Sequence, residues 1–251
     1  SVFNGLAYLG GSQNLSLIVG NKNIASNVTI AVNTFNGSSY GVYLYSYSSL
    51  PATGTVIQGN SFNNGSGYGG VYLLYNTAPV IDSNTVTAAY EGIDLNSCNG
   101  ALRVLRNRIN VVNYYYGIIL TSCAGTSGSP GLVANNFISM GNVSSATGIY
   151  NNSSSYHNIY YNSVYVGGTN PGSYAFYSSG GGAAGSINVV NNIFMNTSGG
   201  YAYYEPSSSE IGTSDYNDLY VVGAKFLAHW GTKDTMDLSG LQFLSGKDVH
   251  S

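Results

Sequence analysis

The chain has 251 residues, of which 43% are hydrophobic and only 7% charged, and its seven basic and ten acidic side chains give a net charge of −3. An ordinary globular domain carries about 25% charged residues. This chain therefore has no basic surface of the kind that binds nucleic acid or anionic membranes. Gly, Ser or Asn interrupts every apolar stretch before about 18 residues, so no membrane insertion is expected.

An asparagine-centred pattern recurs from residue 30 onward. It reads apolar-x-x-Asn-x-apolar, beginning at Ile30, and successive asparagines lie 23 to 30 residues apart. The repeated asparagines are Asn33, Asn60, Asn84, Asn107, Asn136, Asn162 and Asn192, with a degenerate copy at Asn217. Self-similarity at a nearly fixed period is typical of repeat architectures.

A second pattern, Gly-apolar-x-apolar, alternates with the first. It begins at Gly41, Gly70, Gly92, Gly117 and Gly148, and more loosely at Tyr174 and Tyr201. Within each unit the apolar residues have a period of two, which indicates short strands. A unit of about 25 residues cannot bury its own apolar face and must stack on its neighbours. The period is too short for a propeller blade, and the leucine-rich consensus is missing. The sequence therefore predicts an all-β, right-handed parallel β-helix of about seven to eight coils.

The recurrent asparagines have a structural role in this fold. We expect them at a turn between two strands, where Asn tolerates unusual backbone angles. Asn60, Asn84, Asn107, Asn136, Asn162 and Asn192 are predicted to form one internal column, an asparagine ladder in which each amide bonds to those of the adjacent coils.

The two alternating patterns together resemble the right-handed parallel β-helix repeats of pectate-lyase-like and NosD-like proteins, over roughly residues 1–220. The last residues, with Trp230-Gly and Gly246-Lys-Asp-Val-His-Ser, resemble the closing segment of β-helix domains in large secreted surface proteins of Bacteroidetes-type bacteria. The resemblance implies a module of a larger secreted protein, located outside the cell or at its surface. It implies little about activity, because this scaffold carries lyases, hydrolases and adhesins alike.

The chain divides by composition near residue 205. Residues 1–204 are predicted to be the repeats, and residues 205–251, with ten of the 17 charged side chains, the terminal coil and C-terminal cap. Asp237 precedes leucines at 238, 241 and 244, with Gly246 beyond them, which predicts one short amphipathic helix. A cap of this kind covers the open end of a solenoid.

An outward column of aromatic residues is the leading candidate for a binding site. Taking the x of each Gly-apolar-x-apolar unit gives Tyr43, Tyr72, Asp94, Ile119, Tyr150, Phe176 and Tyr203. The candidate glycan-binding or partner-binding residues are Tyr43, Tyr72, Asp94, Tyr150, Phe176 and Tyr203. A strip of exposed rings suits a polysaccharide or another surface protein, although stacked aromatics can also serve the sheet alone.

The candidates for catalysis are weaker. Asp94 should point outward beside Tyr72 and Ile119, whereas Glu91 has the wrong strand parity to join it unless a turn intervenes. Arg103, Arg106 and Arg108 lie close together in the sequence and are candidate contacts for an anion such as a uronate or a sulfate. We expect no catalytic residue, no metal site and no cofactor.

The two cysteines share one phase. Cys98 lies six residues after Gly92, and Cys123 six residues after Gly117, so they should be stacked neighbours on consecutive coils. Their spacing permits either a disulfide or two stacked free thiols.

These observations favour a non-catalytic β-helix module that acts in adhesion or glycan recognition through the aromatic strip. The first alternative is a polysaccharide lyase or glycoside hydrolase, which would require carboxylates and arginines to meet in one groove. The second is a purely structural spacer or filament subunit.

Overall fold

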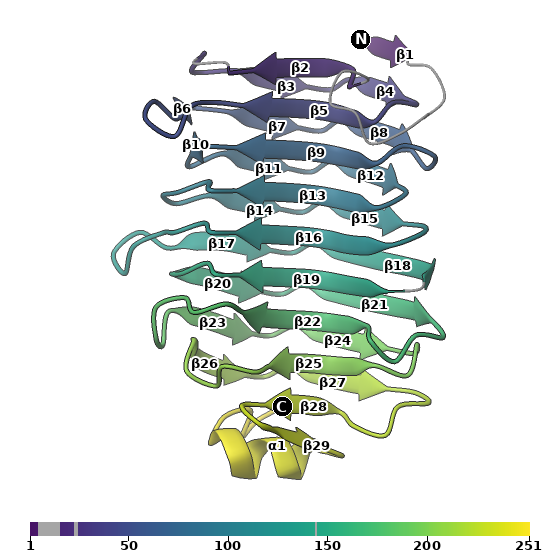
Figure 1. The fold of residues 1–251 in the computed structure, drawn as a ribbon, viewed down its shortest axis with the longest axis vertical. Helices are drawn as coiled ribbons and strands as arrows, with labels where there is room; N and C mark the ends of the chain where they lie inside the picture. Colours follow the sequence, from purple (N-terminus) through teal and green to yellow (C-terminus); the bar gives the residue numbers. More distant parts are fainter. Residues whose placement is uncertain (5–15, 23–24, 144) are drawn as a thin grey trace.

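The computed structural model describes residues 1–4, 16–22, 25–143 and 145–251, which form a parallel β-helix of three long sheets (Figure 1). Each coil contributes one strand to each sheet, and in all three sheets the neighbouring strands of consecutive coils pair in parallel, as in Val86 with Phe62 and Ile109. The predicted fold is confirmed in its strand content, its parallel pairing and its number of coils, since the shortest of the three sheets has eight strands.

In each coil with a ladder asparagine, the strand of sheet A begins at the residue directly after that asparagine. Its nine strands are β1 (Val2–Asn4), β4 (Thr34–Asn36), β8 (Ser61–Asn64), β12 (Thr85–Ala88), β15 (Arg108–Val111), β18 (Phe137–Val143), β21 (Ser163–Gly168), β24 (Ile193–Asn196) and β27 (Asp218–Val221).

Sheet B carries the Gly-apolar-x-apolar units. Its ten strands are β2 (Ile18–Asn21), β5 (Tyr40–Tyr45), β9 (Gly69–Leu74), β13 (Glu91–Asn96), β16 (Tyr115–Thr121), β19 (Ala146–Asn152), β22 (Tyr174–Ser179), β25 (Tyr201–Glu205), β28 (Ala228–Trp230) and β29 (Lys233–Thr235). The last pair, β28 with β29, is antiparallel.

In each coil, the strand of sheet C ends shortly before the ladder asparagine in the sequence. Its eight strands are β3 (Thr29–Ala31), β7 (Val56–Gln58), β11 (Val80–Asp82), β14 (Arg103–Leu105), β17 (Gly131–Ala134), β20 (His157–Tyr160), β23 (Ile187–Val190) and β26 (Ile211–Asp215). A small fourth sheet pairs β6 (Ala52–Thr53) with β10 (Asn76–Thr77).

The asparagine ladder lies at the turn between sheets C and A and is almost fully buried. At a typical step, the Oδ1 of Asn84 accepts hydrogen bonds from the backbone N–H and the side-chain Nδ2 of Asn60, both at 3.0 Å. The Nδ2 of Asn84 donates back to the carbonyl of Ile57 at 2.9 Å. The same bonds link all six predicted members and extend the ladder to Asn33 and Asn217, which confirms the predicted column.

The residue before each ladder asparagine takes the left-handed backbone conformation. Its φ lies between 53° and 62° in every coil, for example at Val32, Gly59 and Arg106. The expectation that the ladder asparagine itself adopts the unusual backbone angles was wrong. The asparagine keeps a negative φ, and its amide reaches the next coil from that conformation.

The recurrent glycines of sheet B face the interior and admit side chains from sheet A. A Cβ built on Gly92 would lie 2.4 Å from both the Ile109 side chain and the Gly117 carbonyl oxygen. Because Gly92 and Ile93 both face inward, the strand does not alternate strictly at this point. This small-residue position is occupied by Ala175 and Ala202 in the later coils.

The C-terminal helix α1 (Leu238–Ser245) lies across the end of the solenoid, as predicted (Figure 1). Asp237 is its N-cap and accepts a hydrogen bond from the Gly240 backbone N–H at 2.8 Å. Gly246 ends the helix in the left-handed conformation with φ 66°. The helix buries Leu241 against the core.

Candidate functional site

The predicted outward column begins as expected on the outer face of sheet B. Tyr43, Tyr72, Asp94, Ile119 and Tyr150 pair in register along five consecutive coils. The tyrosines of the column are half-buried, whereas Ile119 is 7% exposed. The column lies on the outer face because the flanking residues of each strand point into the core.

Phe176 and Tyr203 do not belong to this column, which corrects the prediction for both. Each is fully buried, and Phe176 pairs with the inward Ile149. The reason is that Ala175, and not Tyr174, occupies the position of the recurrent glycine. The inward and outward positions of this strand therefore lie one residue further along the chain than an alignment on Tyr174 places them. The outward column continues instead through Tyr177 and Tyr204.

We call the outer face of sheet B the tyrosine face, because half-buried tyrosines occupy it on most coils. Its members are Tyr43, Tyr45, Tyr72, Tyr116, Tyr150, Tyr174, Tyr177, Tyr201 and Tyr204.

Most rings of the tyrosine face stack on one another along the solenoid axis. Ring centroids are 4.6 Å apart for Tyr43 and Tyr72, and 4.7 Å apart for Tyr150 and Tyr177. Because the rings cover each other's faces, the stack presents mainly ring edges and hydroxyl groups to the solvent. At its C-terminal end Tyr204 stacks on His229 at 4.4 Å.

The hydroxyls of Tyr72, Tyr150 and Tyr201 keep their protons at neutral pH. Burial is the main cause that raises the pKa of Tyr72 and Tyr150, and it raises that of Tyr201, together with Asp234, to about 12. Each hydroxyl can therefore both donate and accept a hydrogen bond.

Glu91 lies on the same outer face as Asp94, contrary to the parity expected from the sequence. The two consecutive inward residues, Gly92 and Ile93, bring both carboxylates outward. The Tyr40 hydroxyl donates to Glu91 Oε2 at 2.9 Å. The Tyr40 ring lies over Gly69 of the intervening coil, and a Cβ built on Gly69 would lie 2.4 Å from this ring.

The carboxylate of Asp94 interrupts the tyrosine column. Its Oδ1 atom is buried and finds no hydrogen-bond partner among the described residues. Burial first, and then the charge of Glu91, raise the pKa of Asp94 well above its usual range. Burial also raises the pKa of Glu91, although hydrogen bonds with Tyr40 and Tyr68 oppose the shift.

The three arginines lie away from these carboxylates. Arg103 is on sheet C, Arg106 at the turn that precedes Asn107, and Arg108 on sheet A. Arg106 forms an ion pair with Asp82, and Arg108 lies 5.6 Å from the ring centre of Phe137. The structure therefore does not join the arginines to Glu91 and Asp94 in one site.

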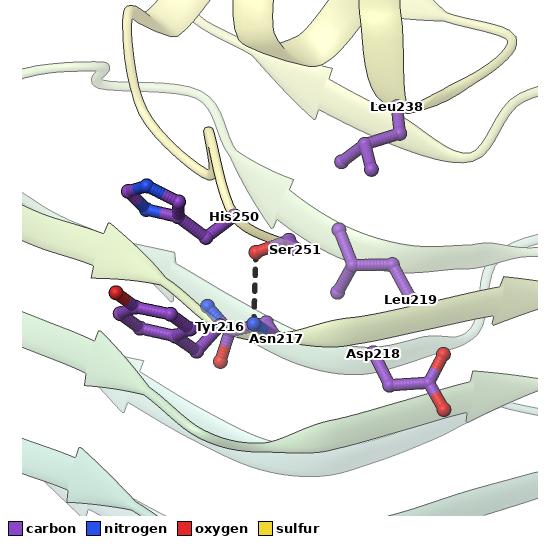
Figure 2. A pocket seen from close by; sticks show the side chains of 7 residues that line it. All are labelled: Tyr216, Asn217, Asp218, Leu219, Leu238, His250 and Ser251. Carbon is purple, nitrogen blue, oxygen red and sulfur yellow. Dashed lines mark hydrogen bonds between the residues drawn. The ribbon is translucent and has the colours of Figure 1, made fainter.

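A cavity of about 490 Å³ lies at the C-terminal end of the ladder, between β27 and α1 (Figure 2). There Ser251 Oγ accepts the backbone N–H of Asn217 at 2.8 Å, and Asp248 Oδ1 accepts its Nδ2 at 2.9 Å. Two oxygens from the tail thus replace the amide oxygen of a further ladder asparagine. No local pattern in the sequence predicts this role for Asp248 and Ser251.

The histidine beside this cavity does not activate the serine. His250 bonds to Asp215 Oδ2 at 2.7 Å and stacks on Tyr216 with the ring centres 5.0 Å apart. Ser251 Oγ donates instead to Asp248 Oδ1 at 2.8 Å. These contacts hold the tail on the last coil.

The two cysteines are stacked neighbours, as predicted, and both are free and buried. The Cys98 backbone N–H donates to Cys123 Sγ at 3.3 Å. Burial and Cys123 raise the pKa of the Cys98 thiol well above its usual range, which opposes thiolate formation. His157 is buried, and its Nε2 lies 3.1 Å from the Cys123 carbonyl oxygen.

Within the described part of the chain, no three His, Cys, Asp or Glu side chains are arranged to hold a metal ion. No helix of that part is long and apolar enough to cross a membrane. Comparison of the chain with family models, curated proteins and solved structures gives no match. The geometry of the tyrosine face is therefore the main indication of function.

Proposed function

We propose that this β-helix is a non-catalytic module of a larger secreted or cell-surface protein, and that it binds glycans through the tyrosine face. The observation that supports the proposal is the row of half-buried tyrosines along one face, repeated from coil to coil. An extended polymer can lie along such a row and meet the same kind of group at each coil.

The tyrosine face combines two kinds of contact that sugars use. Its hydroxyls donate and accept hydrogen bonds, and its ring edges offer apolar area that is already held in place by stacking. Because the rings are fixed before a ligand arrives, binding costs little side-chain entropy.

The proposed cellular setting depends on two resemblances in the sequence. The two alternating repeat motifs are similar to those of pectate-lyase-like and NosD-like proteins, and the closing segment, with Trp230-Gly and Gly246-Lys-Asp-Val-His-Ser, is similar to that of large secreted Bacteroidetes-type surface proteins. We therefore place the module outside the cell or at its surface, in a Bacteroidetes-type surface protein.

One specific observation favours a second candidate function. The stacking of rings on each other, at 4.6 to 4.7 Å in the closest pairs, stabilises the sheet without any ligand. A structural spacer or filament subunit would need no more than this. The lyase or hydrolase alternative has less support, because the arginines lie on other parts of the solenoid than Glu91 and Asp94.

Binding measurements on tyrosine variants test the proposal. The double variant Tyr150→Ala/Tyr177→Ala should bind a polysaccharide ligand of the parent at least about tenfold more weakly, as expected for the loss of central aromatic contacts. The exposed Tyr161 and Tyr165 lie away from sheet B and supply the control Tyr161→Ala/Tyr165→Ala, which should bind like the parent. Thermal melts of both variants separate a loss of binding from a loss of folding.

If a panel of polysaccharides contains a ligand of the parent and the Tyr150→Ala/Tyr177→Ala variant is folded but binds it equally well, the tyrosine face is not the binding site. If the panel contains no ligand, the spacer function is favoured.

A further inference from the structure

The outward column of the tyrosine face is interrupted on two coils, where Asp94 and Ile119 replace tyrosine. The ring of Tyr72 stacks on Tyr43 with one face, and its other face is directed toward the coil of Asp94. On the coil of Ile119, Tyr116 pairs in register with Glu91 and stacks on Tyr150, with ring centres 5.5 Å apart. Asp94 and Glu91 therefore lie between two groups of stacked rings, whereas Asp234 lies at the C-terminal end of the face, where it accepts a hydrogen bond from Tyr201.

The hydrogen bonding of these carboxylates is incomplete within the described residues. Glu91 Oε2 accepts from Tyr40, but the buried Oδ1 of Asp94 accepts from no described group. A buried carboxylate oxygen without a donor is costly, and native proteins rarely leave one unpaired. Because Asp94 as a whole is half-buried, a ligand at the surface that brings a donor to its carboxylate would reduce this cost.

The charge of the surrounding strands defines which donor fits. The strands β5, β9, β13, β16, β19, β22 and β25 contain no lysine or arginine, whereas β13 holds Glu91 and Asp94 on the outer face. Because burial raises the pKa of both carboxyl groups, an anionic ligand would disfavour their charged forms further, whereas a cation would favour those forms and would also be attracted by the face of the Tyr72 ring. A protonated amine meets both conditions and also donates hydrogen bonds.

We propose that the tyrosine face recognises glycans that carry protonated amino groups, that is, polymers of unacetylated amino sugars, and that the ammonium group pairs with Asp94 and Glu91. This inference rests on the proposed glycan-binding function and narrows its ligand class. It excludes the uronate and sulfate ligands that the three arginines suggested, since those arginines lie elsewhere on the solenoid.

A matched pair of oligosaccharides tests the inference. Oligomers of glucosamine and of N-acetylglucosamine with equal length differ in the amine alone, and binding of each is measured by calorimetry where the free amine is protonated. The parent should bind the glucosamine oligomer at least about tenfold more tightly, as expected for a charge-assisted hydrogen bond. An oligogalacturonate should bind more weakly than either.

Two conservative variants identify the residues that recognise the amine. Asp94→Asn should abolish the preference, so that the variant binds the two oligomers equally, and Glu91→Gln should reduce it. Asp218→Asn changes an exposed carboxylate on sheet A and should keep the full preference. Thermal melts establish that all three variants are folded.

Equal or tighter binding of the acetylated oligomer by the parent, or a preference that survives in Asp94→Asn, would overturn the inference. If neutral sugars bind through Tyr150 and Tyr177 without any preference for amines, the proposed glycan function stands and the amine specificity falls. If no oligosaccharide binds, both fall.

Discussion

Single residues at the turn between sheets C and A hold the coils together. Each ladder asparagine satisfies one backbone N–H of the preceding coil, one side-chain N–H and one carbonyl, and all of these groups are buried. Removing an amide therefore leaves several buried polar groups unpaired, which costs more than the loss of one exposed hydrogen bond.

Replacing Asn107 by Ala should lower the free energy of unfolding by about 1 to 3 kcal/mol, because its partners at Asn84 and Asn136 lose their bonds. Chemical denaturation measures the change. The exposed Asn110 on β15 supplies the control, since Asn110→Ala should change stability by less than about 0.5 kcal/mol. Equal effects at the two positions would contradict the ladder.

The residue before each ladder asparagine, which has the left-handed backbone conformation, also affects the stability of the protein. Val32 is 77% exposed and has φ 54°, a conformation that β-branched residues strongly disfavour. Val32→Asn should therefore stabilise the protein by about 1 kcal/mol. The comparable substitution Val222→Asn, at an exposed position without positive φ, should give no gain; a gain there alone would refute the strain argument.

At the scale of elements, the inward glycines of sheet B set the distance between sheets A and B. The side chain of Ile109 and the backbone of the next coil fill the place where the Cβ of residue 92 would lie. Similar contacts recur at Gly117 and Gly148, so the repeat depends on small residues as much as on apolar ones.

Gly92→Ala should destabilise the protein by about 1 to 3 kcal/mol, because the added methyl would overlap backbone that cannot move away. Gly128→Ala is the matched control, since a Cβ there meets nothing within 4 Å. The two midpoints of urea unfolding give the comparison. A loss at Gly128 as large as that at Gly92 would argue against the packing account.

The sequence predicts most of the elements, but it misplaces two of the residues on them. The periods of two and of about 25 residues predicted the sheets and the ladder, and the leucines at 238, 241 and 244 predicted the terminal helix, because each depends on local spacing. Phe176 and Tyr203 were misplaced because the alignment followed Tyr174 and Tyr201, whereas the structure follows the small residues Ala175 and Ala202. An alignment on a position that accepts either glycine or alanine places Tyr177 and Tyr204 in the outward column.

Other parts of the site depend on contacts between distant coils that no local pattern encodes. The outward position of Glu91 follows from two inward residues in succession, and its bond to Tyr40 spans 51 residues. The role of Asp248 and Ser251 as the end of the ladder depends in the same way on the folded tail.

At the scale of the whole molecule, polar groups enter the interior near the C-terminal end. The inward column of leucines at Leu95 and Leu120 continues as Asn151, Ser178 and Glu205. Glu205 is fully buried, and neither of its oxygens makes a hydrogen bond of normal geometry within the described part of the chain. Burial and then Glu210 raise its pKa to about 8, although Ser178 and the backbone of Ser207 and Ser208 oppose the shift.

Stability should therefore fall as the pH rises. The folded state holds the Glu205 proton more tightly than the unfolded chain, so its contribution is complete below pH 4.5 and is lost by about pH 8. The slope for one proton is at most about 1.4 kcal/mol per pH unit. Denaturation of Glu205→Gln should show a flatter profile over this range, and a variant with the parent's slope would exclude Glu205 as the cause.

If the proposed function is right, ligands dock on the tyrosine face while the rest of the solenoid serves as scaffold. Hydroxyl-radical footprinting with and without a saturating glycan ligand measures this for each tyrosine. The account predicts that Tyr150, Tyr177 and Tyr204 become protected while Tyr161, Tyr165 and Tyr220, which lie away from sheet B, react as before. Protection of the second group without the first would contradict it.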